Sequence, residues 1–307
     1  MKKSSSLYNL LILTALLVFS ASSCEKIIDV DIPDRDRKIV INGLLIPDSA
    51  IRVNLTLSLS VLEPDEFVYL PDANVDLFRG SELLGRMGYD SAGYFHLPGV
   101  RALEGAEYRI TAISEGLTGA EATTQVPAPV AILALDTTKV LLDYGQELFK
   151  MTINFDDPPG RNYYGISAEL SYRFGRMEGV ELPSGLITQP AYLSHLDPFL
   201  NEEGVNYRGG IFFDDRLFDG NNKTIEVGLE EYAFAFSDTV WVTVRLEQIA
   251  PSYYFYALSS QAYYSAHSNP FSEPVRVYTN VDGGLGLFSS RSFSERKLLY
   301  LGKGYPR

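Results

Sequence analysis

Two groups of acidic residues are the first candidates for chemistry in this sequence. Asp156-Asp157 precedes a Pro-Pro-Gly turn, and Asp214, Asp215 and Asp219 precede the turn Gly220-Asn221-Asn222. Turns rich in carboxylate oxygens can bind calcium, so Asp214, Asp215 and Asp219 are weak calcium candidates. Asp, Asn and Gly are also the residues that tight turns require, and no twelve-residue calcium loop can be aligned here. We therefore interpret both groups as turns, keep calcium as the open alternative, and predict no cofactor.

The sequence contains no residue pattern typical of a catalytic centre. Its three histidines, His96, His195 and His267, are far apart, and there is no His-Glu-x-x-His motif, no pair of cysteines and no Gly-x-Ser-x-Gly motif. Asp214 and Asp215 are the remaining acid and base candidates, for cleavage of a glycosidic bond. Because neighbouring residues of a strand point to opposite faces, this pair is poorly placed to act on one bond. We predict that the protein is not an enzyme.

The start of the chain has the order of a bacterial secretion signal. Lys2 and Lys3 are followed by an apolar run from Leu7 to Phe19, and then by Ala21-Ser22-Ser23-Cys24. The apolar run is shorter than the roughly 20 residues that span a membrane. Cys24 is the only cysteine, and it follows the small residues at which a lipoprotein signal is cut. We predict removal of residues 1–23, lipidation of Cys24 (detectable with palmitate) and a charged tether over residues 24–37.

Net charge limits the partners of the mature chain. Cleavage after residue 23 leaves 24 basic and 39 acidic residues, a formal charge of −15. A chain of this charge is repelled by phosphate backbones, so we predict no nucleic-acid partner.

Short strands account for the first part of the mature chain. From Ile51 to Leu59 apolar and polar residues alternate strictly, which predicts a strand with one buried face. Seven strands are expected in about 90 residues, at Lys38–Ile46, Ile51–Leu59, Val75–Phe78, Glu82–Arg86, Gly93–Leu97, Glu107–Ile113 and Ala120–Val126. This density predicts an N-terminal β-sandwich over residues 38–128, of the immunoglobulin-like or carboxypeptidase-regulatory-like kind.

A second and larger β-sandwich domain is expected over residues 129–307. Pro127 and Pro129 cannot donate ladder hydrogen bonds, so we place the domain boundary there. The expected strands are Ala131–Leu135, Leu148–Phe155, Tyr163–Phe174, Gly210–Phe213, Thr224–Gly228, Thr239–Gln248, Pro274–Thr279 and Gly286–Ser289. Residues Gly175–Tyr207 show no periodic pattern and are expected to form a long loop. The fold class is therefore all-β and mainly antiparallel.

One α-helix is expected in the second domain, from Tyr253 to His267. Ser252 can cap its start, and Asn269-Pro270 follows its end. The aromatic and aliphatic residues of this segment cover more than one stripe of the helix, which predicts packing on two sides. We interpret its tyrosines as core residues, with an aromatic binding platform as the alternative.

Several stretches of the sequence resemble the DUF4249 family of Bacteroidetes outer-membrane lipoproteins. They include Cys24-Glu25-Lys26, Val40-Ile41-Asn42-Gly43, Phe155-Asp156-Asp157-Pro158, Asn269-Pro270-Phe271-Ser272-Glu273-Pro274 and Asn280-Val281-Asp282-Gly283-Gly284-Leu285-Gly286. The resemblance covers nearly the whole mature chain, and it departs from the family at Ser289-Ser290-Arg291. We interpret the family signature Asn269, Pro270, Phe271, Glu273, Pro274, Asn280, Gly284 and Gly286 as structural, because glycines are needed to turn a chain that leaves a strand.

The resemblance implies an accessory role beside TonB-dependent outer-membrane transporters that import glycans or peptides. Our leading hypothesis is a non-catalytic binding or assembly subunit for nutrient uptake, anchored to the outer membrane through Cys24. Acidic Glu25 after the cysteine loosely resembles the signal for export to the cell surface, with the periplasmic face as the alternative. Two further hypotheses stay open: a surface protein that binds or cleaves glycans, and a scaffold in outer-membrane protein biogenesis.

Overall fold

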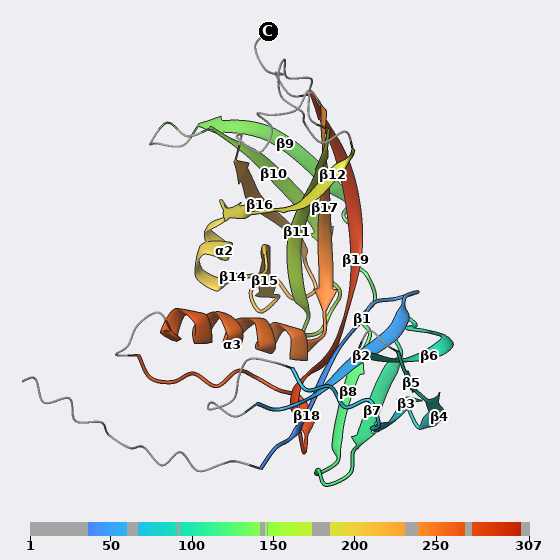
Figure 1. The fold of residues 1–307 in the computed structure, drawn as a ribbon. Coiled ribbons are helices and arrows are strands. Elements are labelled where there is room, and N and C mark those ends of the chain that lie inside the picture. The colour runs from blue at the N-terminus through green and yellow to red at the C-terminus, as the bar shows by residue number, and fades with distance from the viewer. Residues whose placement is uncertain are drawn as a thin grey trace, which may run out of the picture. The chain divides into compact units, whose positions relative to one another are not determined.

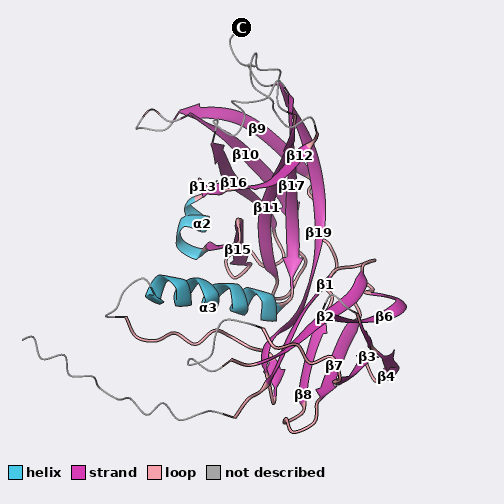
Figure 2. Cartoon of the chain, viewed as in Figure 1, coloured by secondary structure: helices cyan, strands magenta, loops and turns pink. Residues whose placement is uncertain are grey.

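The computed structural model of the chain describes residues 36–59, 67–90, 93–141, 145, 147–173, 185–230, 239–267 and 272–301. Contacts within the chain divide it into two compact units, Met1–Asp36 and Arg37–Arg307, and the structure below is that of the second unit. Short strands make up most of it, and two helices lie in its described residues (Figures 1 and 2).

The elements in chain order are β1 (Ile39–Leu45), β2 (Ala50–Leu57), β3 (Asn74–Arg79), β4 (Glu82–Arg86), β5 (Gly88–Tyr89), β6 (Tyr94–Arg101), β7 (Glu107–Ile113), β8 (Ala120–Gln125), β9 (Ala134–Leu141), β10 (Glu147–Asp156), β11 (Tyr163–Tyr172), β12 (Ile187–Ala191), β13 (Leu193–His195), α2 (Pro198–Glu203), β14 (Val205–Tyr207), β15 (Gly210–Asp214), β16 (Asn222–Glu230), β17 (Thr239–Ile249), α3 (Pro251–His267), β18 (Val281–Asp282) and β19 (Leu285–Leu301).

These strands form three sheets. A ten-stranded sheet has the order β14-β15-β11-β17-β19-β1-β2-β6-β5, with β12 also paired to β11. A four-stranded sheet has the order β13-β16-β10-β9, and a five-stranded sheet has the order β18-β8-β7-β3-β4. Of the strand pairs in the described residues, β1 with β19 is the one parallel pair. The predicted all-β, mainly antiparallel class is confirmed.

The N-terminal core lies between the five-stranded sheet and one part of the ten-stranded sheet. Its period-two pattern is clearest in β2, where Ile51, Val53 and Leu55 are buried and the residues between them are more exposed. Val75 and Leu77 of the five-stranded sheet complete it from the other side. A strand with one apolar face must cover that face with a second layer, and here the second layer is another sheet.

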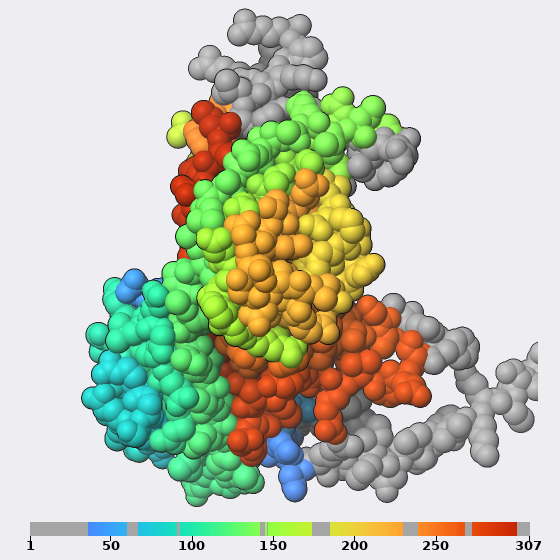
Figure 3. Space-filling model, turned by 180° about the vertical axis from the view of Figure 1, so that it is seen from behind, coloured from blue at the N-terminus to red at the C-terminus, as the bar shows by residue number. Residues whose placement is uncertain are grey.

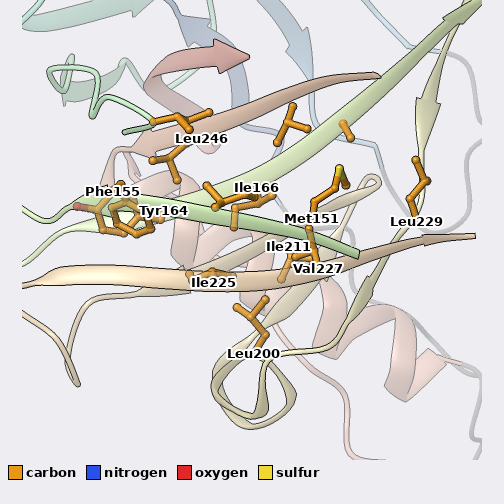
Figure 4. Packing of buried hydrophobic residues seen from close by; sticks show 14 of the residues in the cluster. Met151, Phe155, Tyr164, Ile166, Leu200, Ile211, Ile225, Val227, Leu229 and Leu246 are labelled. Carbon is orange, nitrogen blue, oxygen red and sulfur yellow. The ribbon is translucent and has the colours of Figure 1, made fainter. Parts of the chain in front are cut away.

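The C-terminal core lies between the four-stranded sheet and the other part of the ten-stranded sheet. Figure 4 shows Phe155 of β10 beside Tyr164 of β11, and the two rings are 5.1 Å apart between centroids. Ile225 and Val227 of β16 and Leu246 of β17 are fully buried in the same cluster. The chain therefore contains two sandwich-like arrangements, as expected.

Strand β19 belongs to both arrangements. Residues 285–290 pair with β1, and residues 291–301 pair with β17. Phe288 is fully buried in the N-terminal core together with Val281 of β18, although both residues come late in the chain. Residues 38–128 therefore do not build the N-terminal core alone, and their independence as a domain stays a prediction.

The parallel contact between β1 and β19 requires glycine. Gly286 has a φ of +102°, and a Cβ placed on it would lie 2.2 Å from the carbonyl oxygen of Ile41. A Cβ on Gly284 would lie 2.5 Å from the carbonyl oxygen of Ile39. Real side chains cannot approach a backbone atom this closely, so both positions are restricted by sterics.

Four expectations from the sequence are wrong in detail. Pro274–Thr279 has no strand, and the expected strand Gly286–Ser289 is the start of the much longer β19. The described part of the expected loop Gly175–Tyr207 contains β12, β13, α2 and β14, so a second helix joins the predicted one. Ser252 lies inside the first turn of α3, and its hydroxyl is 2.7 Å from that of Ser289. Proline at the first helical position starts this helix instead.

Neither helix in the described residues combines the length and the apolar character needed to cross a membrane.

Replacing Phe288 tests the dependence of the N-terminal core on β19. We expect Phe288→Ala to lower the free energy of unfolding by about 3–5 kcal/mol, because it removes a fully buried ring. Phe293→Ala on the same strand is the matched control, since that ring is only partly buried and faces Arg245. Chemical denaturation of both variants measures the difference. Equal losses would contradict the shared role of β19.

Candidate functional site

Two loops that carry the acidic groups run side by side because of the strand pairing. Residues 157–162 join β10 to β11, and residues 215–221 join β15 to β16. Strand β10 pairs with β16 up to Asp156 and Asn222, and β11 pairs with β15 from Tyr163 and Asp214. Both loops therefore leave the same end of the two sheets. The backbone N–H of Asp157 donates to the carbonyl of Asn221 at 3.1 Å, which joins them directly.

Asp157, Asp215 and Asp219 converge where these loops meet. One carboxylate oxygen from each lies within 4.8 Å of those of the other two. Asp157 is 5% exposed and Asp215 is 1% exposed, whereas Asp219 is exposed. Two of the three predicted calcium candidates, Asp215 and Asp219, are thus brought together, with Asp157 as the third member. We call these three residues the aspartate cluster.

Asp214 takes no part in the aspartate cluster. Its carboxylate pairs with Arg216 at 2.8 Å and with Arg161 at 3.3 Å, and its side chain is 4% exposed. Successive residues at the end of β15 point in opposite directions, which separates Asp214 from Asp215. The structure therefore does not bring Asp214 together with the other two calcium candidates, and its charge is balanced by two arginines instead.

Each carboxylate of the aspartate cluster also accepts a backbone hydrogen bond from across the site. Gly220 donates to Asp157 at 2.7 Å, Asn162 donates to Asp215 at 2.6 Å, and Gly160 donates to Asp219 at 2.9 Å. Every one of these bonds joins one loop to the other. The aspartates therefore hold the two turns together, in agreement with our interpretation of them as turn residues.

Burial raises the pKa of Asp157, which is the largest effect on this carboxyl group. Hydrogen bonds from the Tyr164 hydroxyl and the Gly220 N–H lower the pKa, and the charges of Asp215 and Asp219 raise it again. The pKa of Tyr164 is raised too, first by burial and then by its hydrogen bond to Asp157. Ionisation of Asp157 is therefore costly at this buried position.

A cation is the ligand that this geometry suits. Calcium binds oxygen ligands at about 2.3–2.6 Å, so ligand atoms on opposite sides of one ion are separated by about twice that distance. The spacing of 4.8 Å or less in the aspartate cluster meets this limit. Glycoside cleavage is a poor fit, because two of the three carboxylates are buried away from any polymer.

The described histidines are not arranged for catalysis. His195 is hydrogen-bonded to Asn206 at 3.1 Å, and His267 stacks on Tyr263 with ring centroids 5.8 Å apart. His96 Nδ1 is buried without a hydrogen-bond partner. No hydrogen bond or ion pair found among the described residues joins a histidine to a serine or an acid.

The family signature divides into two parts. Asn280 makes three bonds to backbone: its amide donates to the carbonyls of Thr123 and Phe288, and its oxygen accepts from the N–H of Phe288. With Gly284 and Gly286 it shapes the start of β19. Glu273 and Pro274 are exposed instead. The residues Asn269, Pro270 and Phe271 lie outside the described part of the chain, as does Cys24.

The last two turns of helix α3 contain no buried residue. Its buried residues, Ser252, Tyr254, Ala257 and Ser260, all precede the last seven residues, of which none is buried. Four large apolar side chains on α3 are exposed, at 37–68%: Phe255, Leu258, Tyr263 and Tyr264. We call these four residues the α3 surface. In the space-filling view, the orange-red residues of α3 lie open at the outside of the molecule (Figure 3).

A shallow hollow lies beside the end of α3. Its volume is about 280 Å³, and its lining residues are Tyr263, Ala266, His267, Ser272, Glu273, Pro274 and Val275. An aromatic ring next to an acid and an imidazole is a combination that can contact a small polar ligand.

The fold and these sites define an all-β protein with two sandwich cores, a partly buried aspartate cluster and an exposed aromatic helix end. The family model described as "Domain of unknown function (DUF4249)" matches residues 25–297. The chain belongs to this family.

Other comparisons add little. No curated protein matches the chain. A solved structure of a beta-glucuronidase from glycoside hydrolase family 2 is 11% identical over 89% of this chain and 24% of its own, with a TM-score of 0.22. The B domain of a biofilm associated protein is 8% identical over 84% of this chain and 85% of its own, with a TM-score of 0.20. The chain spans about a quarter of the glucuronidase, and similarity at this level carries no argument about function.

Calcium should stabilise the protein through the aspartate cluster. After chelation, we expect added calcium to raise the melting temperature, because a divalent ion bound only by the folded state shifts the unfolding equilibrium. Asp219→Asn should remove this rise, since Asp219 is the exposed member and its replacement leaves the core untouched. Differential scanning fluorimetry of both proteins is sufficient. If calcium does not change the melting temperature of the wild type, the aspartate cluster does not bind calcium and only stabilises the two turns.

Without metal, the folded protein should become more stable at lower pH because Asp157 is then protonated. The pKa of Asp157 is raised in the folded state, so its ionisation destabilises the fold at neutral pH. That penalty disappears as the pH falls through the folded pKa and is absent below the unfolded pKa of about 3.9. With chelator present, lowering the pH from 7 toward 4 should therefore raise the free energy of unfolding of the wild type relative to that of Asp157→Asn. Urea unfolding at several pH values measures this, and parallel pH profiles would disprove it.

Proposed function

We propose that this protein is a lipid-anchored, non-catalytic accessory subunit that docks on a TonB-dependent outer-membrane transporter. The observation that carries the proposal is the α3 surface: Phe255 and Leu258 are exposed along the helix, and Tyr263 and Tyr264 are exposed on its last turns, where no residue is buried. Aromatic residues are enriched at protein interfaces, and tyrosine is among the residues that contribute most of the binding energy there.

The anchor is the lipid-modified Cys24 at the end of a secretion signal, and it places the body on the outer membrane at the cell surface. The sequence around Cys24 supports this step: basic residues, an apolar run and small residues precede the cysteine, and a charged tether follows it. A triacylated cysteine exceeds the two signals that stable membrane attachment needs. Anchoring therefore does not depend on the transporter.

Replacing Cys24 with alanine tests the anchor. The variant should leave the membrane fraction and take up no labelled palmitate, because it lacks the sulfur that carries the acyl chains. Ser23→Thr, next to it, is a control that keeps the cysteine. If Cys24→Ala fractionates and incorporates palmitate like the wild type, the anchor is wrong.

Replacing residues of the α3 surface tests the docking step. The wild type, solubilised in mild detergent, should co-purify with a large β-barrel protein, and Leu258→Glu with Tyr264→Glu should reduce its recovery at least tenfold. This loss is expected because charges in the centre of an interface remain unpaired when it forms. Tyr192→Glu is the matched control, since Tyr192 is 78% exposed and lies outside α3. Recovery of the wild type as a lone monomer would contradict the proposal.

A second candidate function is glycan binding at the hollow beside α3. The position of Tyr263 next to Glu273 favours it, because a sugar ring can stack on tyrosine and donate hydroxyl hydrogen bonds to a carboxylate. Titration with a panel of polysaccharides tests binding, and Tyr263→Ala should weaken it. Release of reducing ends from the same panel would show cleavage instead.

A further inference from the structure

The start of the folded unit, at Lys38, lies near several exposed apolar residues. Lys38 and Ser58 exchange two hydrogen bonds, from the N–H of Lys38 to the hydroxyl of Ser58 and from the N–H of Ser58 to the carbonyl of Lys38, both at 2.9 Å. On the other side of β2, Leu57 donates to the carbonyl of Val68 at 2.8 Å. Neighbouring strands are about 4.8 Å apart, so Val68 is about 10 Å from the point where the tether begins.

Three large apolar side chains near this point are exposed. Phe67 is 70% exposed, Val68 is 46% exposed, and Leu59 is 38% exposed. We call these three residues the exit patch. A single exposed apolar residue needs no explanation, but here three of them lie near the same end of β2.

The exit patch is held in place by the body. Tyr69, which follows it, packs over Gly93 so closely that a Cβ on that glycine would lie 2.8 Å from the ring. Leu70 donates to the carbonyl of Leu55 at 3.3 Å and packs against the N-terminal core. The apolar side chains of Phe67 and Val68 are therefore presented to the outside by a fixed backbone.

The length of the tether limits the distance between the exit patch and the membrane. From Cys24 to Lys38 there are 14 residue steps, which span at most about 50 Å when fully extended and about 20 Å as a flexible chain. Lipidation at Cys24, which is part of the function proposed above, therefore keeps the exit patch within that distance of the bilayer at a high effective concentration. Aromatic and aliphatic side chains are favoured at the membrane–water interface.

We propose that Phe67, Val68 and Leu59 insert into the lipid interface beside the anchor. This rests on the proposed lipid anchor, and it adds a second point of membrane contact that fixes the orientation of the body. The mature charge of −15 opposes anionic headgroups, so the interaction is apolar in origin and needs no anionic lipid.

Depth-dependent fluorescence quenching tests the insertion. The probe is the lipidated full chain carrying Phe67→Trp, reconstituted in phosphatidylcholine vesicles that contain brominated phosphatidylcholine. Tyr192→Trp is the matched control on a residue of similar exposure elsewhere, and wild-type Trp241 gives the background in both. We expect the brominated lipid to quench the tryptophan at position 67 at least twofold more than the tryptophan at position 192. Val68→Trp provides the same readout if Phe67→Trp lowers the melting temperature.

The possible outcomes separate this inference from the anchor. A protein that does not float with the vesicles overturns both the anchor and the insertion. A protein that floats but shows equal quenching at positions 67 and 192 overturns the insertion alone. A tryptophan at position 67 that brominated lipid does not quench, but that native outer membranes shield from acrylamide, would identify a protein as the occupant and also overturn the insertion.

Discussion

The close parallel contact between β1 and the start of β19 is the constraint on which the rest of the structure depends. It brings residue 286 against the backbone of Ile41, at a distance that only glycine allows. Because of this contact Phe288 enters the N-terminal core, where its ring lies next to Gly43 and Val53. The same strand then continues beside β17 and covers the C-terminal core. One segment thus joins two hydrophobic clusters that are otherwise built from separate parts of the chain.

The aspartate cluster follows from strand order, not from local sequence. Two loops, each with an ordinary turn composition, become neighbours because β10 pairs with β16 and β11 pairs with β15. The buried carboxylates of Asp157 and Asp215 then reach backbone N–H groups of the opposite loop. Turn residues that bond across to another turn fix both, which explains how polar groups with so little exposure are tolerated.

Much of the fold could be predicted from residue periodicity. The alternation from Ile51 to Leu59 placed β2, and the run from Thr239 to Gln248 placed β17 nearly residue for residue. The strand predictions were wrong for segments that pair with residues distant in the sequence. β19 is longer than its apolar pattern indicates, because its polar residues Ser289, Ser290 and Ser292 are buried between layers. For the site, Asp215 and Asp219 could be named in advance. Their partner Asp157 was visible only as a separate acidic turn, since its pairing depends on strand order.

The shared strand also has a consequence for the order in which the chain is made. Residues 38–128 emerge first from the ribosome, yet their core lacks Phe288 and the strand that pairs with β1 until about 160 more residues have followed. Contacts of such long sequence separation form slowly, because the intervening chain must first be closed into a loop. The N-terminal segment must therefore keep an incomplete core, with the edge of β1 unpaired, until the C-terminal strand arrives.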